Sequence, residues 1–420
     1  MKLRKTLNFG VYLKNMEIEH KIEWTKKHMP VMAKLTEEFL KSKPFSGLTI
    51  GVCLHLTKET AILLLALQGG GARIIASASN PLSTQDDVVA YLIAKGMTVY
   101  GKKGMSVEEY NHGLLEVIKT NANYIIDDGA DLTDMIHKSL TNPDNFLPMG
   151  GLEETTTGVT RIKNMDLKYP IIAVNDADTK HLFDNVYGTG QSTLDGIIRS
   201  TNILLAGKTF VVAGYGYCGK GLAQRARGMG CDVIVTEINP IRALQAHMDG
   251  FKVMEMKMAA FKADVIVTVT GSINVLDKQI NNLKDGAIIA NAGHFDIEIN
   301  KKFLETNAKK VTKISDDITE YTLIDDPTDP DYPTRVNLLS EGRLVNLSAA
   351  EGHPSEVMDM SFANQALSLE YLIKHKEMFN ENKVYNVPNE IDRNVALLKL
   401  EALKVYIDKE TDEQINYRTS

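Results

Sequence analysis

The sequence of 420 residues has only three cysteines, Cys53, Cys218 and Cys231, and their spacing fits neither a metal site nor a disulfide framework. The apolar run 61–67 is far too short to cross a membrane, and the first 20 residues lack the apolar stretch of a signal peptide. Basic residues are not in excess either, because the formal net charge is −7. These absences predict a cytoplasmic protein with neither a membrane nor a nucleic acid as partner.

The composition is that of an ordinary globular protein, with 44% hydrophobic and 24% charged residues, and the length suggests two or three domains. Strand-like and helix-like stretches alternate in two successive series. Strands are expected at 48–54, 72–77, 97–101, 123–129 and 169–176, and again within 208–216, 231–237, 263–271 and 286–294. This alternation predicts an α/β fold of two doubly wound parallel sheets. Beyond about residue 345 the pattern turns helical, over 356–379 and 390–405.

A glycine motif opens the second series. Gly214, Gly216 and Gly219 have the spacing G-x-G-x-x-G, between an expected strand and an expected helix. Glu237 ends the next strand, at the position of an acid that binds an adenosine ribose hydroxyl. The motif therefore predicts a dinucleotide site, and the carboxylate favours NAD because it repels the extra phosphate of NADP. Arg242, five residues later, could bind that phosphate, so NADP remains the minor alternative. The structural alternative is a tight glycine turn that binds no ligand.

Polar side chains gather where the expected strands end, which is where open α/β sheets bind ligands. They are His55, Thr57, Glu59, Asp127, Asp128, Asp131, Asn175, Asp176, Lys180, Asp184, Asn185, His294 and, later in the chain, His353. Each has a structural alternative: a lone histidine is commonly structural, and Lys180 and Asp184 have the spacing of a helix ion pair. Their convergence on one sheet edge favours general acid–base chemistry on a small polar ligand.

Eight stretches of the sequence resemble the S-adenosylhomocysteine hydrolase family, in particular its compact archaeal or thermophile-type members. They are CLHLTKETA (53–61), SNPLSTQDD (79–87), IIDDGADL (125–132), EETTTGV (153–159), VNDADTKHLFDNVYGTGQS (174–192), VVAGYGYCGKG (211–221), NAGHFDIEI (291–299) and EGRLVNLSAAEGHPSEVMDMSFANQ (341–365). The resemblance extends from about residue 22 to 415, and several of these motifs are specific to the family.

The resemblance implies a reversible hydrolysis of S-adenosyl-L-homocysteine to adenosine and L-homocysteine, hence an adenosylhomocysteinase of the methyl cycle. Transient oxidation at C3′ acidifies the C4′ proton, and loss of that proton expels the thiol. One tightly bound NAD per subunit is regenerated in every turnover, in a homotetramer. The implied domains are a substrate-binding domain 1–185 completed by 346–382, an NAD-binding Rossmann domain 186–345, and a C-terminal tail 383–420 that contacts the cofactor or the oligomer.

The resemblance also assigns roles to single residues. The catalytic group is His55 near C5′, Asp131 as the base at C4′, Lys180 and Asp184 at the 3′-hydroxyl, and His294 at the ribose. The substrate contacts are Glu154 and Thr155 at the ribose, Thr57 and Glu59 at the purine edge, and Leu54, Leu344, Leu347, His353 and Met358 around the ring. The cofactor contacts are Thr155, Thr156, Thr157, Asn185, Glu237, Asn291, Asn346 and the three glycines. No resident metal is expected, and a monovalent cation near Gln85 and His353 is left open.

The sequence departs from the family at two informative positions. Tyr217 stands in the glycine loop where many relatives have an aspartate, and Glu351 stands where a methionine is frequent near the purine. Glu59 can accept a hydrogen bond from the 6-amino group of adenine, which favours adenine over the hypoxanthine of S-inosyl-L-homocysteine, the main alternative.

Two other function classes remain as alternatives. A non-catalytic nucleotide-binding regulatory homologue would have lost the catalytic residues. A 2-hydroxyacid dehydrogenase would consume NADH with a 2-oxo acid, which an absorbance assay detects.

Overall fold

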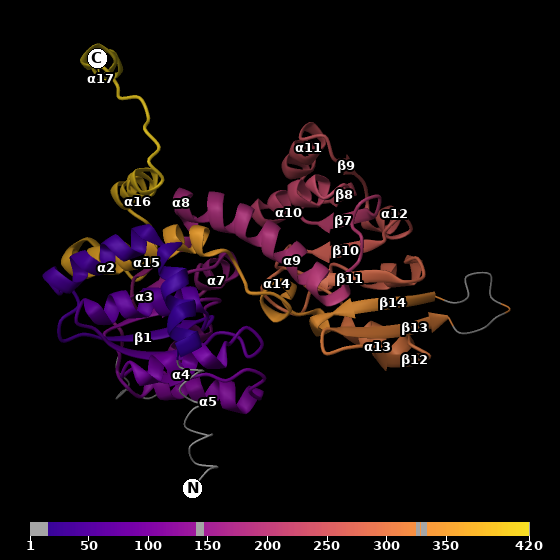
Figure 1. Cartoon of the computed structure of the whole chain (residues 1–420), viewed down its shortest axis with the longest axis horizontal. Helices are drawn as coiled ribbons and strands as arrows, with labels where there is room; N and C mark the ends of the chain where they lie inside the picture. The colour runs from indigo at the N-terminus through magenta and orange to yellow at the C-terminus, as the bar shows by residue number, and fades with distance from the viewer. Residues whose placement is uncertain (1–15, 140–146, 325–327, 329–333, 420) are drawn as a thin grey trace, which may run out of the picture.

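The computed structural model describes residues 16–139, 147–324, 328 and 334–419. Two α/β units lie side by side, with α9 (Thr189–Thr201) and α14 (Val345–Ser348) between them (Figure 1). Part of the N-terminal stretch considered for a signal peptide lies outside the described residues. Within them, no helix has the length and hydropathy required to span a bilayer.

The first sheet has the strand order β15-β6-β5-β4-β1-β2-β3, and all of its neighbours are parallel. Its strands are β1 (Thr49–Leu54), β2 (Arg73–Ala78), β3 (Thr98–Tyr100), β4 (Tyr124–Asp127), β5 (Gly150–Glu153), β6 (Ile171–Ala173) and β15 (Val384–Asn386). Its helices are α2 (Pro30–Ser42), α3 (Lys58–Gly69), α4 (Asp86–Ala94), α5 (Val107–Ile118), α6 (Asp131–Ser139) and α7 (Thr156–Ile162). The central strands are apolar on both faces, as parallel strands covered by helices on both sides must be.

Two strands of this sheet were not expected. β5 has the sequence GGLE, and β15 has only three residues. Glycine is a poor strand former, but here it allows close packing: a Cβ at Gly151 would lie 2.9 Å from the side chain of Ile125. Burial between neighbouring strands therefore overrides the local propensity.

The second sheet has the order β12-β13-β14-β11-β10-β7-β8-β9. Its strands are β7 (Thr209–Ala213), β8 (Asp232–Thr236), β9 (Lys252–Val253), β10 (Val265–Thr268), β11 (Ala287–Asn291), β12 (Lys310–Lys313), β13 (Ile318–Ile324) and β14 (Thr334–Leu339), and its helices are α10 (Tyr217–Gly228), α11 (Pro240–Met248), α12 (Met256–Ala260) and α13 (Lys301–Asn307). The predicted parallel arrangement holds from β14 to β9, whereas β13 is antiparallel to both of its neighbours. Only four residues join β12 to β13, too few for a parallel crossover.

The C-terminal part of the chain returns to the first unit. α15 (Ser355–Lys374) packs against α2 and α3, and α16 (Asn389–Ala402) packs against α15. The Asp392 carboxylate of α16 accepts hydrogen bonds from the backbone N–H groups of Asp178 (2.7 Å) and Thr179 (2.8 Å). These residues begin α8 (Asp178–Lys180), which continues into a π-helix over His181–Gly188. A residue near the C-terminus therefore caps the short helix that ends in Lys180. The last helix, α17 (Asp412–Thr419), lies away from both units (Figure 1).

Candidate active site

A cavity of about 1120 Å³ lies between the two units. It is lined by residues that follow the carboxyl ends of strands in both sheets, among them His55 after β1, Asp128 after β4, Glu154 after β5, Glu237 after β8 and His294 after β11. Open parallel sheets bind ligands at this edge. The two sheets thus share one site, as the polar strand ends predicted.

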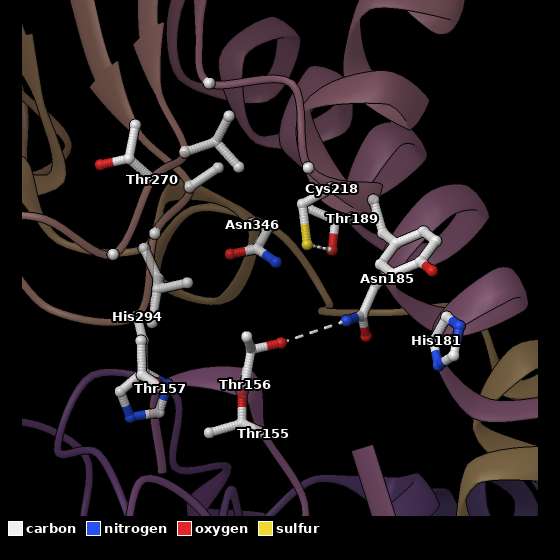
Figure 2. Close-up of a pocket in the computed structure, with 18 of the residues that line it drawn as sticks. Thr155, Thr156, Thr157, His181, Asn185, Thr189, Cys218, Thr270, His294 and Asn346 are labelled. Carbon is white, nitrogen blue, oxygen red and sulfur yellow. Dashed lines mark hydrogen bonds between the residues drawn. The ribbon is translucent and has the colours of Figure 1, made fainter. Parts of the chain in front are cut away.

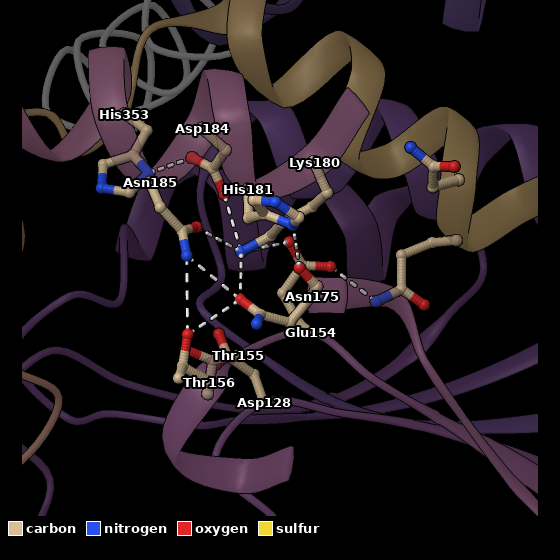
Figure 3. Close-up of polar contacts among 12 residues, drawn as sticks. Asp128, Glu154, Thr155, Thr156, Asn175, Lys180, His181, Asp184, Asn185 and His353 are labelled. Atoms are coloured by element: carbon tan, nitrogen blue, oxygen red, sulfur yellow. Dashed lines mark hydrogen bonds and ion pairs between the residues drawn. The ribbon is translucent and has the colours of Figure 1, made fainter. Parts of the chain in front are cut away.

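Lys180 is the centre of a buried polar cluster in this cavity (Figure 3). Its Nζ lies 3.0 Å from Asp184 Oδ2 and 3.7 Å from Glu154 Oε1. It also donates to the side-chain oxygens of Asn185 at 2.9 Å and Asn175 at 3.4 Å. The π-helix brings Lys180, Asp184 and Asn185 to the same side of the chain. One ammonium group is therefore held by two carboxylates and two amides.

The charges in this cluster determine its protonation. Burial alone would lower the pKa of Lys180, but the carboxylates of Asp184 and Glu154 raise it above its ordinary value. Burial would likewise raise the pKa of Asp184, but Lys180 and His353 lower it. For Glu154 burial prevails over the attraction of Lys180 and raises the pKa to about 7. At neutral pH Lys180 and Asp184 are an ion pair, and Glu154 is close to half ionised.

His353 extends this cluster toward the second unit. Its Nδ1 is hydrogen-bonded to Asp184 Oδ1, and its Nε2 lies 3.3 Å from Thr189 Oγ1 and 3.2 Å from Asn346 Nδ2. A continuous hydrogen-bonded path thus leads from Lys180 through Asp184 to the imidazole.

A second group of side chains, His55, Asp128 and His294, faces the same cavity. His55 Nε2 lies 3.5 Å from Asp128 Oδ2, and the two imidazole centroids are 6.2 Å apart. Ser83 Oγ lies 2.5 Å from His55 Nδ1 and fixes the ring. Burial lowers the pKa of His55 to about 4, although Asp128 opposes the shift, and burial also lowers the pKa of His294. The His55 imidazole is therefore neutral at pH 7 and can accept a proton.

Asp131 is not among the residues that line the cavity. Its carboxylate accepts hydrogen bonds from Arg161 Nη1 at 2.6 Å and Tyr110 Oη at 2.8 Å, and Arg161 also contacts the carbonyl of Gly129. Asp128, three residues earlier, is the acid of this loop that faces the cavity. Asp131 thus begins α6 and pairs with an arginine outside the cavity lining, whereas Asp128 is still in the turn after β4.

Gly214 and Gly216 of the glycine turn line the cavity. Thr155, Thr156, Thr157, Asn185 and Asn346 line the same cavity (Figure 2). A Cβ at Gly219 would lie 2.0 Å from the carbonyl oxygen of Gly214, so this turn requires glycine. The Glu237 carboxylate accepts hydrogen bonds from the backbone N–H groups of Tyr215, Ile238 and Asn239 at 2.7–2.9 Å. These bonds hold it at the end of β8, beside the N-terminus of α10.

The polar groups of this region fit a dinucleotide. Gly214, Gly216, Glu237 and the run Thr155–Thr157 line the cavity, together with Asn185 and Asn346. Thr157 Oγ1 and Asn346 Oδ1 are buried and have no hydrogen-bond partner within the described part of the chain. Buried polar atoms in native proteins are normally paired. A ligand rich in hydroxyl, amide and phosphate groups satisfies both.

Three further predicted contacts do not line this cavity. Gly219 belongs to the glycine turn but is not among the lining residues. Asn291 does not line the cavity: its side chain bonds Thr268 Oγ1, the backbone of Gly293 and the carbonyl of Phe295. It shapes the loop that carries His294, because a side chain at the last position of β11 turns into the loop that follows. Gln85 lines a separate cavity of about 130 Å³, where its Oε1 is buried without a partner among the described residues. A monovalent cation there stays a prediction.

The remaining predicted substrate contacts also line the main cavity. They are Leu54, Thr57, Glu59, Thr155, Leu344, Leu347, His353 and Met358. Ser355 donates to Glu59 Oε1 at 2.7 Å. A buried carboxylate surrounded by apolar side chains suits a flat heterocycle with a polar edge.

Sequence reasoning gave no role to three polar residues of the site. Asn175 accepts from Lys180, Gln365 Nε2 donates to Glu154 Oε2 at 2.6 Å, and Ser355 orients Glu59. Asn175 carried a signal, since it lies two residues after β6 and is among the polar side chains noted at the strand ends. Gln365 and Ser355 had none, because they lie on the distant α15.

Comparison with known proteins identifies the family in which a polar cluster and a glycine turn share one cavity. The model of the S-adenosyl-L-homocysteine hydrolase family matches residues 13–150, and the model of its NAD-binding domain matches residues 185–352. An adenosylhomocysteinase of Aquifex aeolicus is 54% identical over 95% of each chain. The chain belongs to the S-adenosyl-L-homocysteine hydrolase family.

Other members of this family differ in their named substrate. The S-inosyl-L-homocysteine hydrolase of Methanocaldococcus jannaschii is 53% identical over 96% of this chain and 95% of its own. An adenosylhomocysteinase of Sulfurisphaera tokodaii is 51% identical over 94% of each chain. Sequence identity to the adenosylhomocysteinases and to the S-inosyl-L-homocysteine hydrolase is nearly equal. Sequence identity therefore does not indicate whether the substrate contains adenine or hypoxanthine. The NAD-binding domain of the family coincides with the unit that contains the glycine turn, and NAD is the cofactor.

Proposed function

We propose that the protein is an adenosylhomocysteinase, which reversibly hydrolyses S-adenosyl-L-homocysteine to adenosine and L-homocysteine. The observation that carries this proposal is the cluster of Lys180, Asp184 and Glu154, buried in the same cavity as a dinucleotide turn. We assign the nucleoside to residues 1–185 with 346–382, and NAD to residues 186–345. The tail 383–420, a homotetramer and a cytoplasmic location are the remaining parts of the prediction.

Bound NAD supplies a reversible oxidant for a secondary alcohol of the ribose, and Thr155–Thr157, Asn185, Glu237, Asn346 and the glycine turn would hold it. We assign proton exchange with that hydroxyl to Lys180 Nζ, which is charged and therefore takes the hydroxyl proton only as it passes one of its own protons to Asp184. Its charge is balanced by Asp184, which in turn contacts His353. Glu154 accepts a hydrogen bond from a ribose hydroxyl when it is ionised, and Gln365 orients it.

We assign proton removal at C4′ to Asp128, and proton exchange at C5′ to His55. His55 is neutral at pH 7 and lies beside the carboxylate. It can accept from Asp128 the proton removed at C4′ and pass it to the departing thiolate; the neutral ring so restored can then take a proton from water. His294 closes the other side of this group. His294 lies on a loop of the second unit, whereas His55 and Asp128 belong to the first. The proton-transfer site is therefore complete only when the two units face one another.

Replacing Asp128 distinguishes this assignment from the one made for Asp131. D128N should lower kcat for thiol release by about 10²–10⁴-fold, the usual contribution of a general acid or base. D131N should keep kcat within about tenfold, since Asp131 meets Arg161 outside the cavity, but should lower the melting temperature. Steady-state kinetics and thermal denaturation of both variants check this, and the reverse order of activities would restore Asp131 as the base.

The raised pKa of Glu154 predicts a pH dependence. Because the carboxyl ionises only near pH 7, kcat/KM should rise about tenfold from pH 6 to pH 8 as the acceptor forms. E154Q should be slower throughout and lack this rise, because an amide does not titrate. Initial rates in a buffer series measure both profiles. The same rise in E154Q would assign the titration to another group.

Thiol release by the NAD-loaded protein tests the proposed function, with S-adenosyl- and S-inosyl-L-homocysteine assayed in parallel. Faster release from the adenine substrate is expected, because Glu59 accepts from an amino group. S-inosyl-L-homocysteine hydrolysis is the second candidate, favoured by the relative from Methanocaldococcus jannaschii. Thiol from neither substrate would contradict both and favour a regulatory role.

A further inference from the structure

Three charged side chains surround the purine end of the cavity without belonging to the catalytic group. Lys58 Nζ lies 3.4 Å from Glu59 Oε1 and 3.3 Å from Glu351 Oε2. Arg199 Nη1 lies 3.6 Å from the other oxygen of Glu351. Glu351 thus links the N-terminus of α3 to the helix α9 between the two units.

The two carboxylates and the ammonium group have different access to the cavity. Glu59 and Glu351 both line it, whereas Lys58 does not. The side chain of Lys58 is nevertheless only 15% exposed, since it lies between the two acids. Burial would raise the pKa of Glu351, but Lys58 and Lys21 lower it. The purine end therefore presents two carboxyl groups, with the Lys58 ammonium group in contact with both.

Adenine and hypoxanthine differ at the edge that such groups would contact. Adenine presents a donor at the 6-amino group and an acceptor at N1. Hypoxanthine presents an acceptor at O6 and a donor at N1–H. An acceptor opposite position 6 selects adenine, and an ammonium group at that place selects hypoxanthine. A site built to hydrogen-bond one group discriminates strongly against an analogue that leaves a buried polar atom unpaired.

We propose that Glu351 is a specificity-determining residue, which keeps the Lys58 ammonium group behind Glu59 and so restricts the substrate to 6-aminopurine nucleosides. The inference rests on the proposed function, whose site it refines. Without Glu351, the flexible lysine side chain loses one of its two carboxylates and can turn toward the cavity. There its ammonium group donates a hydrogen bond to the O6 atom of a 6-oxopurine.

The test compares kcat/KM for S-adenosyl- and S-inosyl-L-homocysteine in four proteins: wild type, E351M, K58M and the double variant K58M/E351M. Wild type should prefer the adenine substrate, and E351M should shift the ratio at least tenfold toward the inosine substrate. K58M should keep the wild-type preference. The double variant should return to the wild-type ratio, since the ammonium group responsible for the shift is gone. NAD content and thermal denaturation verify that each variant is folded.

Each outcome decides one statement. An unchanged ratio in E351M, or a shift that persists in K58M/E351M, overturns the role of Glu351 and leaves the proposed function intact. A wild type that prefers the inosine substrate also overturns it, because the tether then does not exclude 6-oxopurines. A wild type that releases thiol from neither substrate defeats the proposed function itself.

Discussion

Replacing Lys180 with methionine is expected to lower kcat by about 10²–10⁴-fold, the range for loss of a positioned proton-transfer group. Methionine keeps the length of the side chain but removes the ammonium group. The lost step is proton exchange at the ribose hydroxyl, so the partial reaction should fail as well. Adding adenosine to the NAD-loaded variant should produce no absorbance of reduced nicotinamide, whereas the wild-type protein should show it at once.

K180M also leaves two buried carboxylates without their common partner. Removing one member of a buried ion pair typically costs about 3–5 kcal/mol, so the variant should melt lower than wild type and recover as the pH falls and Glu154 takes up a proton. K163M is the matched control, because Lys163 pairs with Asp176 at 3.2 Å on a half-exposed surface. It should retain activity and stability. Reduced nicotinamide formed by K180M would show that another group accepts the proton.

Replacing Gly219 with alanine is expected to abolish stable binding of NAD. The added Cβ would meet the carbonyl oxygen of Gly214 at 2.0 Å and its carbonyl carbon at 2.8 Å. Both are backbone atoms, so the turn must open to relieve the contact, and overpacking of this kind typically costs about 1–3 kcal/mol or more. The opened turn no longer directs the N-terminus of α10 at the dinucleotide. NAD retained after gel filtration and the increase in melting temperature on adding NAD measure this effect.

G228A provides the control in the same helix. A Cβ at Gly228, the last residue of α10, meets nothing within 4 Å. Alanine there should keep NAD, and it should stabilise the chain slightly, by about 0.4–1 kcal/mol, because the unfolded chain becomes less flexible. Stoichiometric NAD in purified G219A would contradict the assignment of this turn to the dinucleotide.

The sequence was sufficient to predict the parts of the fold and site that depend on local patterns. Strands β1 and β7 are apolar runs, followed by a polar residue and a glycine respectively. The position of Glu237 at the end of the next strand could be predicted from its distance to Gly214 in the sequence. The sequence could not show which acid after β4 faces the ligand. Asp127 turns back to accept from the backbone of Thr133, Asp128 faces the cavity, and Asp131 pairs with Arg161. That choice depends on an arginine 30 residues away.

The same limit applies wherever a distant element determines a contact. The strand β5 forms because Gly151 fits against Ile125 and Gly150 against Leu372, although glycines oppose strand formation locally. Gln365 and Ser355 reach the site because α15 returns to the first unit after the whole second unit. Tertiary packing therefore determines these positions, and no periodicity in the sequence records it.

The capping of α8 by Asp392 has a consequence for the order in which the protein is made. Residue 178 leaves the ribosome long before residue 392, so the helix that ends in Lys180 waits for most of the chain before its first N–H groups are paired. β15 completes the edge of the first sheet equally late. The nascent second unit can fold around its own glycine turn during this interval. The cap on the helix that ends in Lys180 can therefore form only after the whole second unit has been synthesised.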